Sequence, residues 1–467
     1  MSRLLRAIDS APIRTALVLA VLHLVIRAWG IARPGLWADE AINVWWAQES
    51  PAEVIKESLR TPDPPLFNLL LCGWTHLFGL GEAAVRALAA LFAVATAVGV
   101  FALARAWFGG RTALFASLAL LVSGSLQAYA HETRPTTLAC ALAVASLLAL
   151  EAIARRPGVR AVLALALVDA ALCYTHYLTA FFLVAQLGMV LLMPHTPGTL
   201  KRYLSGQLLA AVLVAPLAIE VLRRHLGPAA WQRRPTGAVI AGALDELMGG
   251  YAAIYVGLAL VALAAVVRHS PWRRRAALLL WLAMPFVFML VISWRVPMFH
   301  ARYVLYSAPA LAILAAEAIG ALPLGEWAQL GLLAVTLAAG AIGFSPSPPK
   351  PHQWDVVASR LKSLTGDRAI VVEPRWHAAV LAYYYDRAAF RDPEHLEERL
   401  KADRVWLLRR GEPPNAGQMG SPKTILSVRF DVEGVDAASD ARVLEPSYAL
   451  TGVDLLGGAR LSTFNRR

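Results

Sequence analysis

The chain has 467 residues, of which 58% are hydrophobic and 16% are charged, and its mean hydropathy is +0.53. Soluble proteins carry about 25% charged residues, so this composition excludes a conventional water-soluble enzyme and a disordered chain alike. The apolar residues form long uninterrupted runs, unlike the alternation that is typical of a β-barrel. The sequence therefore predicts a polytopic α-helical membrane protein.

The net charge of +12 is unevenly distributed along the chain. Residues 1–349 hold 26 Lys and Arg against 16 Asp and Glu, whereas residues 350–467 hold 18 against 16. The basic excess lies between apolar runs and forms no separate basic domain, so we expect no nucleic-acid partner.

The first apolar run lies near residues 15–31, follows three arginines and has no small-residue cleavage site after it. These features predict an uncleaved first span that starts in the cytoplasm. Ten further spans are predicted at about 83–107, 112–130, 135–154, 160–175, 177–194, 203–222, 251–268, 276–294, 303–321 and 326–344.

With this topology every short cytoplasmic connection is basic, as the positive-inside rule expects. The outer ends of the spans also carry arginines, which that rule does not explain. Binding of a phosphate-bearing ligand at the outer interface would account for them. They are Arg134, Arg223, Arg224, Arg233, Arg234, Arg295 and Arg302.

Two segments are predicted to lie outside the spans. Residues 34–82 form a tryptophan-rich external loop with two short interfacial helices, at about 41–59 and 65–80. After a proline-rich linker, residues 346–467 have the composition of a soluble domain. Alternating helices and strands predict a small external α/β domain. Its elements are expected at 353–364 (helix), 367–374 (strand), 376–386 and 392–402 (helices) and 404–410 (strand), with a further short β element later.

Asp39 and Glu40 follow the first span closely. Two adjacent carboxylates immediately outside a membrane are costly unless they serve a function. They also suit the first turn of an interfacial helix, where the helix dipole favours negative charge. Both interpretations stay open on these residues alone.

Three further polar clusters are predicted on the same side, at residues 131–135, 173–177 and 299–303. Each has a structural explanation: Glu132 and Arg134 could pair, His176 could cap a helix, and Arg302 could reach lipid headgroups. Together they place carboxylates, arginines, a histidine and aromatic groups at one depth. That combination favours transfer of a group from a lipid phosphate carrier.

These motifs, in this order, resemble those of the GT-C superfamily of membrane glycosyltransferases. Within it, the chain is similar to the bacterial group related to protein O-mannosyltransferases and to the lipid A aminoarabinose and galacturonic acid transferases. The resemblance covers about residues 1–345, and the tail matches only in kind. The motifs are Trp-x-Asp-Glu at 37–40, Asp-Pro-Pro-Leu-Phe-Asn-Leu-Leu at 63–70, Phe-Gly-x-Gly-Glu-Ala-Ala-Val-Arg at 78–86, Glu-Thr-Arg-Pro at 132–135, Tyr-Thr-His-Tyr at 174–177 and Arg-Tyr at 302–303.

The resemblance implies a GT-C transmembrane catalytic domain at 1–345 and an inverting glycosyltransferase that uses a polyprenyl-phosphate-linked sugar. It implies that Asp39 is the catalytic base and that Glu40 orients the acceptor or the base, or binds a metal. Arg302 and Tyr303 would hold the donor phosphate. The further pocket candidates are Arg86, Glu132, Arg134 and His176.

One departure from the family pattern lies before the Pro-Pro step, where many relatives carry Lys or His and this chain has Asp63 or Pro64. Either another basic residue substitutes there, or Asp63 helps to coordinate a divalent cation such as Mg²⁺ or Mn²⁺. In the second case Asp39 and Glu40 are the other candidate ligands.

The resemblance places the protein in a bacterial inner membrane, with the active site and tail domain on the periplasmic side. The acceptor would be a lipid, glycan or protein hydroxyl. Two alternatives from other classes stay open: a transporter or flippase of polyprenyl-linked glycans, with Asp169 as its main buried acid, and a non-enzymatic assembly subunit.

Overall fold

The structure of the chain is a computed structural model. The described residues are 10–60, 64–192, 197–224, 235–247, 272–322, 324–350, 353–363, 368–373, 377–392, 395, 398, 400, 405–407, 424–430, 448–456 and 459–466. By its contacts the chain divides into two compact units, each built from separate segments.

The first, here called the helical unit, comprises Met1–Ile31, Ile55–Phe67 and Arg86–Pro348. The second, the loop–tail unit, comprises Ala32–Val54, Asn68–Val85 and Pro349–Arg467. Most of the predicted external loop therefore groups with the tail, across more than 260 intervening residues of the helical unit.

Helices occupy every predicted span that lies within the described residues, whereas the span predicted at 251–268 lies outside them. The helices are α2 (Pro12–Ala28), α6 (Glu82–Phe108), α7 (Gly110–Leu121), α8 (Gly124–Ala130), α9 (Thr136–Arg155), α10 (Val159–Thr175), α11 (Ala180–Leu192), α12 (Thr199–Arg224), α13 (Gly237–Leu247), α15 (Trp272–Arg295), α16 (Ala308–Ala321) and α17 (Glu326–Gly343). Three short 3-10 turns precede α11 and α16: η1 (Tyr177–Thr179), η2 (Ala301–Tyr303) and η3 (Leu305–Ser307).

Among the described residues, four helices are long and apolar enough to cross a membrane: α6, α9, α12 and α15. The predicted span at 112–130 is two helices, α7 and α8, which meet at an angle of 61° and together also pass this test. Apolar side chains remain exposed along α2 and α12, for example Leu17 at 62% and Leu208 at 70%. Lipid would cover them, because it solvates apolar surface that water does not.

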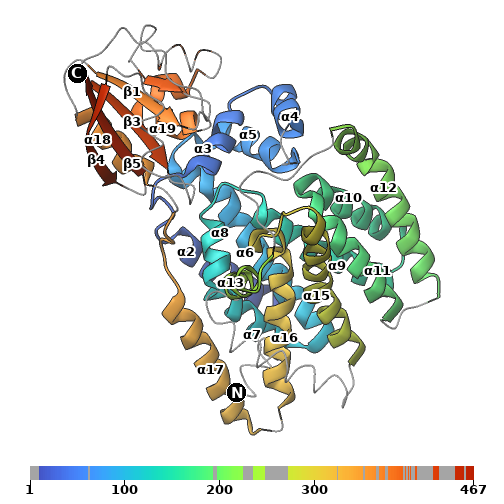
Figure 1. The fold of residues 1–467 in the computed structure, drawn as a ribbon. Coiled ribbons are helices and arrows are strands. Elements are labelled where there is room, and N and C mark those ends of the chain that lie inside the picture. The colour runs from blue at the N-terminus through green and yellow to red at the C-terminus, as the bar shows by residue number, and fades with distance from the viewer. Residues whose placement is uncertain are drawn as a thin grey trace. The chain divides into compact units, whose positions relative to one another are not determined.

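In the helical unit α9 lies against α10, α10 against α12, α11 against α15, and α7 against α16 (Figure 1). Its core centres on Phe182, whose ring makes edge contacts with Trp281 at 5.7 Å and Tyr306 at 6.4 Å between ring centroids. All three side chains are almost completely buried.

A closed ring of hydrogen bonds joins four helices inside this core. Ser146 of α9 donates to Asp169 of α10 at 2.5 Å, and Gln207 of α12 donates to the other carboxylate oxygen at 2.6 Å. Gln186 of α11 donates to the Ser146 hydroxyl at 2.5 Å and accepts from Gln207 at 3.0 Å. Both carboxylate oxygens of the buried Asp169 are therefore satisfied by neighbouring helices, as a polar group away from water requires.

The described residues of the predicted external loop are largely helical. Two interfacial helices were expected, but three are present, because the first prediction divides into α3 (Ala38–Trp46) and α4 (Pro51–Arg60), and α5 (Leu66–Phe78) follows. Pro51 is favoured at the first position of a helix and cannot donate within one, so it starts α4 and does not continue α3.

The tail folds as a mixed five-stranded sheet in the order β2-β1-β3-β5-β4. The strands β1 (Arg368–Glu373), β2 (Val405–Leu407) and β3 (Thr424–Phe430) are parallel, and β4 (Tyr448–Leu456) and β5 (Ala459–Arg466) form an antiparallel hairpin added at β3. Helices α18 (Trp354–Ser363) and α19 (Ala378–Tyr385) pack against each other, and the short α20 (Arg387–Phe390) follows. The predicted helix 392–402 lies largely outside the described residues.

Candidate functional site

The two adjacent carboxylates lie in the first turn of α3, in the loop–tail unit. Trp37 is the extended residue before the helix, and its backbone N–H donates to Glu40 Oε2 at 3.3 Å. Glu40 is completely buried, whereas Asp39 is partly exposed. The helix-start interpretation therefore holds for Glu40, which caps α3, and Asp39 is the carboxylate that solvent can reach.

Glu40 also faces a cation from a distant segment. The Lys350 ammonium lies 3.9 Å from Glu40 Oε2, and the two side chains are 2% and 0% exposed. A metal ion at Glu40 would have to compete with this ammonium for the same carboxylate. Within the described residues no group of three or more His, Cys, Asp and Glu side chains is placed to hold a metal. Of the three predicted ligands, Glu40 is therefore engaged by Lys350, and Asp63 lies outside the described residues.

The helical unit gathers a second set of predicted residues around Tyr303. The His176 ring lies 5.0 Å from the Tyr303 ring and the His300 ring 5.8 Å from it, between ring centroids. The Arg302 guanidinium lies over the same ring at 5.3 Å, a distance at which a cation is attracted to an aromatic face. The structure thus brings together His176, Arg302 and Tyr303 from turns more than 120 residues apart.

Short turns hold these side chains in place. His300 precedes η2, and its Nδ1 accepts from the Arg302 N–H at 3.3 Å, while His176 precedes η1 and accepts from the Leu178 N–H at 3.2 Å. The Tyr306 hydroxyl donates to the Leu178 carbonyl at 2.9 Å. This hydrogen bond ties η3 to η1 and so keeps the two histidine turns together.

The loop between α8 and α9 brings Glu132 and Arg134 to the same cluster. Burial, together with the nearby charges of Arg302 and Arg134, lowers the pKa of His300 from its ordinary value of 6.5 to about 4. His300 is therefore neutral at pH 7, and the charges of two guanidinium groups act on it. Two cations beside uncharged imidazole and phenol groups form an arrangement suited to a phosphate.

A carboxylate that was not predicted joins this cluster. Glu246 of α13 accepts a hydrogen bond from the buried Tyr129 hydroxyl, and it is coupled electrostatically to Glu132 and Arg302. Its only signal in the sequence is the Asp245-Glu246 doublet before an apolar stretch. Because acidic pairs at helix ends are common, that signal alone does not single it out.

A buried arginine that was also not predicted supports the loop that carries Glu132 and Arg134. Arg27 at the end of α2 donates to the Leu120 carbonyl at 2.5 Å, to the Leu121 carbonyl at 3.2 Å and to Gln127 Oε1 at 2.6 Å. These carbonyls belong to the last residues of α7, where the helix is interrupted and has no intrahelical donors left. Arg27 therefore stabilises the bend between α7 and α8.

The end of α2 and helix α8 also contact the linker that precedes the tail. Gly30 has φ +75°, and a Cβ there would lie 2.3 Å from Ser347 Oγ, which donates to the Gly30 carbonyl at 3.2 Å. Gln127 donates to the Pro346 carbonyl at 3.3 Å. The His131 ring lies 2.7 Å from the Arg27 carbonyl oxygen, so the loop after α8 is fixed to the end of α2.

The remaining predicted residues lie elsewhere. Arg86 is completely buried and donates to the Ile31 carbonyl at 3.0 Å, which gives it a structural partner. Asp63 lies outside the described residues, as do Arg233 and Arg234. Arg223 is exposed near the end of α12.

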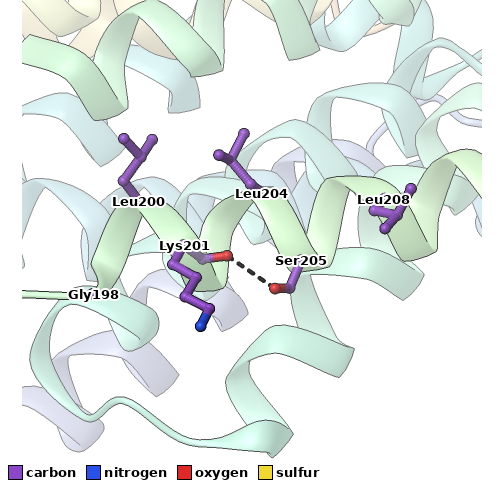
Figure 2. Close-up of a pocket in the computed structure, with 6 residues that line it drawn as sticks. All are labelled: Gly198, Leu200, Lys201, Leu204, Ser205 and Leu208. Carbon is purple, nitrogen blue, oxygen red and sulfur yellow. Dashed lines mark hydrogen bonds between the residues drawn. The ribbon is translucent and has the colours of Figure 1, made fainter.

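One pocket, of about 540 Å³, lies along the start of α12. Figure 2 shows Leu200 and Leu204 on one side of this helix and Lys201 on the other, where the Ser205 hydroxyl donates to the Lys201 carbonyl at 2.9 Å. Leu204 is 50% exposed, so this is an open apolar groove of the kind that lipid fills. It contains none of the predicted site residues.

The fold and these clusters define a multi-pass membrane protein with polar groups concentrated at turns between helices. The family model of dolichyl-phosphate-mannose-protein mannosyltransferases matches residues 62–219. No curated protein matches the chain significantly.

Solved structures give matches over nearly the whole chain. ArnT from Cupriavidus metallidurans in the apo state is 15% identical, with a TM-score of 0.60 over 97% of this chain and 98% of that one. The same protein bound to undecaprenyl phosphate is 15% identical, with a TM-score of 0.58 over 96% and 97%. The oligosaccharyltransferase AglB from Archaeoglobus fulgidus, in complex with an inhibitory peptide and a dolichol-phosphate, is 11% identical, with a TM-score of 0.50 over 89% and 70%.

At these identities the likeness is one of fold. It agrees with the predicted resemblance, as does the match of the mannosyltransferase family model to residues 62–219.

Proposed function

We propose that this protein is an inverting glycosyltransferase that moves a sugar from a polyprenyl-phosphate carrier to an acceptor hydroxyl at the outer face of a bacterial inner membrane. The sugar is a hexose or a pentose, and the acceptor is a lipid, glycan or protein. The relatives with undecaprenyl phosphate and dolichol-phosphate bound support a lipid-phosphate donor in general.

In the proposed reaction the Asp39 carboxylate takes the proton of the acceptor hydroxyl. The acceptor oxygen attacks the anomeric carbon from the face opposite the phosphate, so the configuration inverts. The bond between that carbon and the phosphate oxygen breaks, and its electron pair stays with the departing polyprenyl phosphate. Buried Glu40 holds the start of α3 and thereby orients Asp39.

The leaving phosphate gains negative charge as the bond breaks. Arg302, with Arg134 beside it, offsets this charge, and cations fixed in advance stabilise a transition state more than mobile solvent does. Tyr303 and His176 line the phosphate, neutral His300 leaves the positive charge with the arginines, and Glu132 contacts a sugar hydroxyl. Arg86 supports this machinery through the Ile31 carbonyl.

The observation that carries this proposal is that His176 and Arg302 lie at the Tyr303 ring, while Arg134 from a third turn of the helical unit acts electrostatically on His300 beside it. A mere membrane anchor has no need for two arginines around a neutral imidazole. The closed ring at Asp169 adds support, because its two oxygens are engaged by neighbouring helices. A transport pathway would require polar groups that line a cavity.

A radiolabelled polyprenyl-phosphate sugar, supplied to vesicles containing the full-length protein, tests the proposal. We expect covalent transfer to an acceptor by the wild type and a loss of about a hundred- to ten-thousandfold in Asp39→Asn, the contribution typical of a general base. Glu53→Gln is the matched control, because Glu53 also lies in the first turn of an external helix. It should transfer like the wild type.

The same assay separates the alternatives. Movement of the labelled lipid across the bilayer without covalent transfer would indicate a flippase. Neither transfer nor movement would favour an assembly subunit. Normal transfer by Asp39→Asn would still show that the protein is a glycosyltransferase, but it would show that Asp39 is not the base.

A further inference from the structure

Hydrogen bonds join the loop that carries Asp39 and Glu40 to the tail, although the two segments are far apart in the sequence. Helix α3 packs against α19. The Tyr384 hydroxyl accepts from the Leu36 N–H at 2.5 Å, Gln48 donates to the Phe390 carbonyl at 3.1 Å, and the Tyr383 hydroxyl donates to the Leu80 carbonyl at 2.7 Å. These partners are 348, 342 and 303 residues apart in the sequence.

The chain passes very close to the tail immediately before Asp39. A Cβ at Gly35 would lie 2.6 Å from the Tyr384 hydroxyl and 3.1 Å from the Asp355 carboxyl carbon. The next residue, Leu36, is completely buried. Since the Tyr384 hydroxyl also receives the Leu36 N–H, the tail fixes both the path and the hydrogen bonding of the main chain that leads into α3.

The tail also supplies the cation for the buried carboxylate. Lys350, at the start of the tail segment, lies 3.9 Å from Glu40 Oε2, and both side chains are almost completely buried. A buried carboxylate without a compensating cation is strongly unfavourable. The contact with Lys350 therefore holds the Glu40 carboxylate in place, one residue from Asp39.

We propose that Lys350 and Tyr384 are positioning residues for Asp39, so that the tail segment is part of the catalytic loop and not an independent accessory domain. Tyr384 fixes the main chain before α3, and Lys350 fixes Glu40 within its first turn. The inference rests on the proposed role of Asp39, and neither residue touches substrate in it.

The experiment measures transfer by the full-length protein in vesicles with a polyprenyl-phosphate sugar, together with the thermal midpoint of each variant. Lys350→Met should lower kcat by about ten- to a hundredfold, the range that a small misplacement of a catalytic group produces. The KM for the donor should stay within about twofold, because the donor-phosphate residues belong to the helical unit. Lys350→Arg should recover most of kcat, since it restores the charge.

Tyr384→Phe is a second, milder probe that keeps the ring and removes only the hydroxyl. We expect kcat to fall about three- to tenfold, again with little change in donor KM. Lys362→Met is the matched control, because Lys362 is an exposed lysine of the same segment, on α18. This variant should have the kcat, the donor KM and the thermal midpoint of the wild type.

Wild-type kcat in both Lys350→Met and Tyr384→Phe would overturn the inference. So would a loss in Lys350→Met that Lys350→Arg does not recover, or one that follows the amount of folded protein. If Lys350→Met does not fold, Lys350→Arg and Tyr384→Phe decide: a fall of kcat at constant donor KM in Tyr384→Phe supports the inference, and an unchanged kcat overturns it. Failure of the proposed function looks different, because then the wild type transfers no sugar or Asp39→Asn remains active.

Discussion

The helical unit and the loop–tail unit hold their charged groups in different ways. In the loop–tail unit a buried carboxylate, Glu40, faces a buried ammonium, Lys350, and the pair is neutral overall. In the helical unit Arg302 and Arg134 lie around His300, an imidazole that stays neutral at pH 7 because its pKa is lowered to about 4 by burial and by both cations. The loop–tail unit thus buries one ion pair, whereas the helical unit couples its arginines electrostatically to the carboxylates Glu132 and Glu246 around neutral side chains.

The proposed function gives the two arrangements of charge different roles. A compensated pair needs nothing further, and its function is to hold geometry. Arginines at a turn can add charge-assisted hydrogen bonds to a phosphate, and these hydrogen bonds are strong. Under the proposed function, the helical unit recognises the donor and the loop–tail unit activates the acceptor.

The largest effect expected from this division is at Arg302. Arg302→Ala should lower kcat by about a hundred- to a thousandfold, the usual loss when a group that stabilises developing charge is removed. It should also weaken use of the lipid-phosphate donor, which Asp39→Asn should not. Steady-state transfer kinetics with varied donor concentration measure both.

Arg295→Ala is the control for Arg302, because Arg295 is an exposed arginine at the end of α15. If it matched the loss in Arg302→Ala, general attraction of the donor to positive charge would be sufficient. If Arg302→Ala kept the donor KM and kcat of the wild type, the phosphate would have to be bound elsewhere.

Helices were predictable from the sequence because an apolar run long enough to cross a membrane is a local property. Each run within the described residues is helical, and the bend of 61° inside the run at 112–130 is the main departure. That run contains Gly124 after Val122 and Ser123, and Ser123 Oγ accepts the Leu126 N–H at 3.2 Å as a new helix start. Hydropathy cannot detect such a cap, since the serine interrupts the run only briefly.

The grouping of the external loop with the tail could not be predicted in the same way. It depends on single hydrogen bonds such as Leu36 to Tyr384, and a tyrosine in an apolar helix carries no signal of a partner 348 residues away. The strands β3, β4 and β5 were expected only as a weak β element. Their order in the sheet depends on pairing between distant segments, which is not local.

The site residues divide along the same line. Asp39, Arg302, Tyr303 and His176 were predicted from motifs beside span ends, and the last three lie together, although their roles stay predictions. Lys350 was hidden in a linker and Arg27 inside an apolar span. Lys350 matters because it contacts a buried carboxylate, and Arg27 matters because it donates to buried carbonyl groups. The sequence alone does not show these contacts.

A smaller effect is expected at Arg27, which supports the loop that carries Glu132 and Arg134. Arg27→Lys should destabilise the protein by about 2 kcal/mol, because one ammonium cannot replace a guanidinium that reaches Gln127 and two carbonyls of α7 at once. The donor KM should rise about threefold as the loop with Glu132 and Arg134 loosens. Thermal midpoints in lipid nanodiscs check the loss of stability, and transfer kinetics with varied donor concentration check the rise in donor KM.

The opposite end of α7 offers a matched control. Arg111 also donates to a glutamine side chain, that of Gln329, and its guanidinium lies 5.5 Å from the Phe115 ring. Arg111→Lys should lower the midpoint less and should leave the donor KM unchanged. An equal rise of donor KM in both variants would mean that the bend does not position the loop.

The smallest effect expected is a pH dependence at His300. Its pKa is about 4 in the folded protein against an ordinary value of 6.5, so the unfolded chain binds a proton more readily as the pH falls below 6.5. The stability that neutral His300 contributes is therefore complete above pH 6.5 and is lost progressively down to pH 4, by about 1 kcal/mol at pH 5.5. His300→Asn keeps an acceptor for the Arg302 N–H but does not titrate. Its thermal midpoint should fall less steeply than that of the wild type between pH 7 and pH 4. Parallel curves would show that His300 is not the imidazole held neutral between the two arginines.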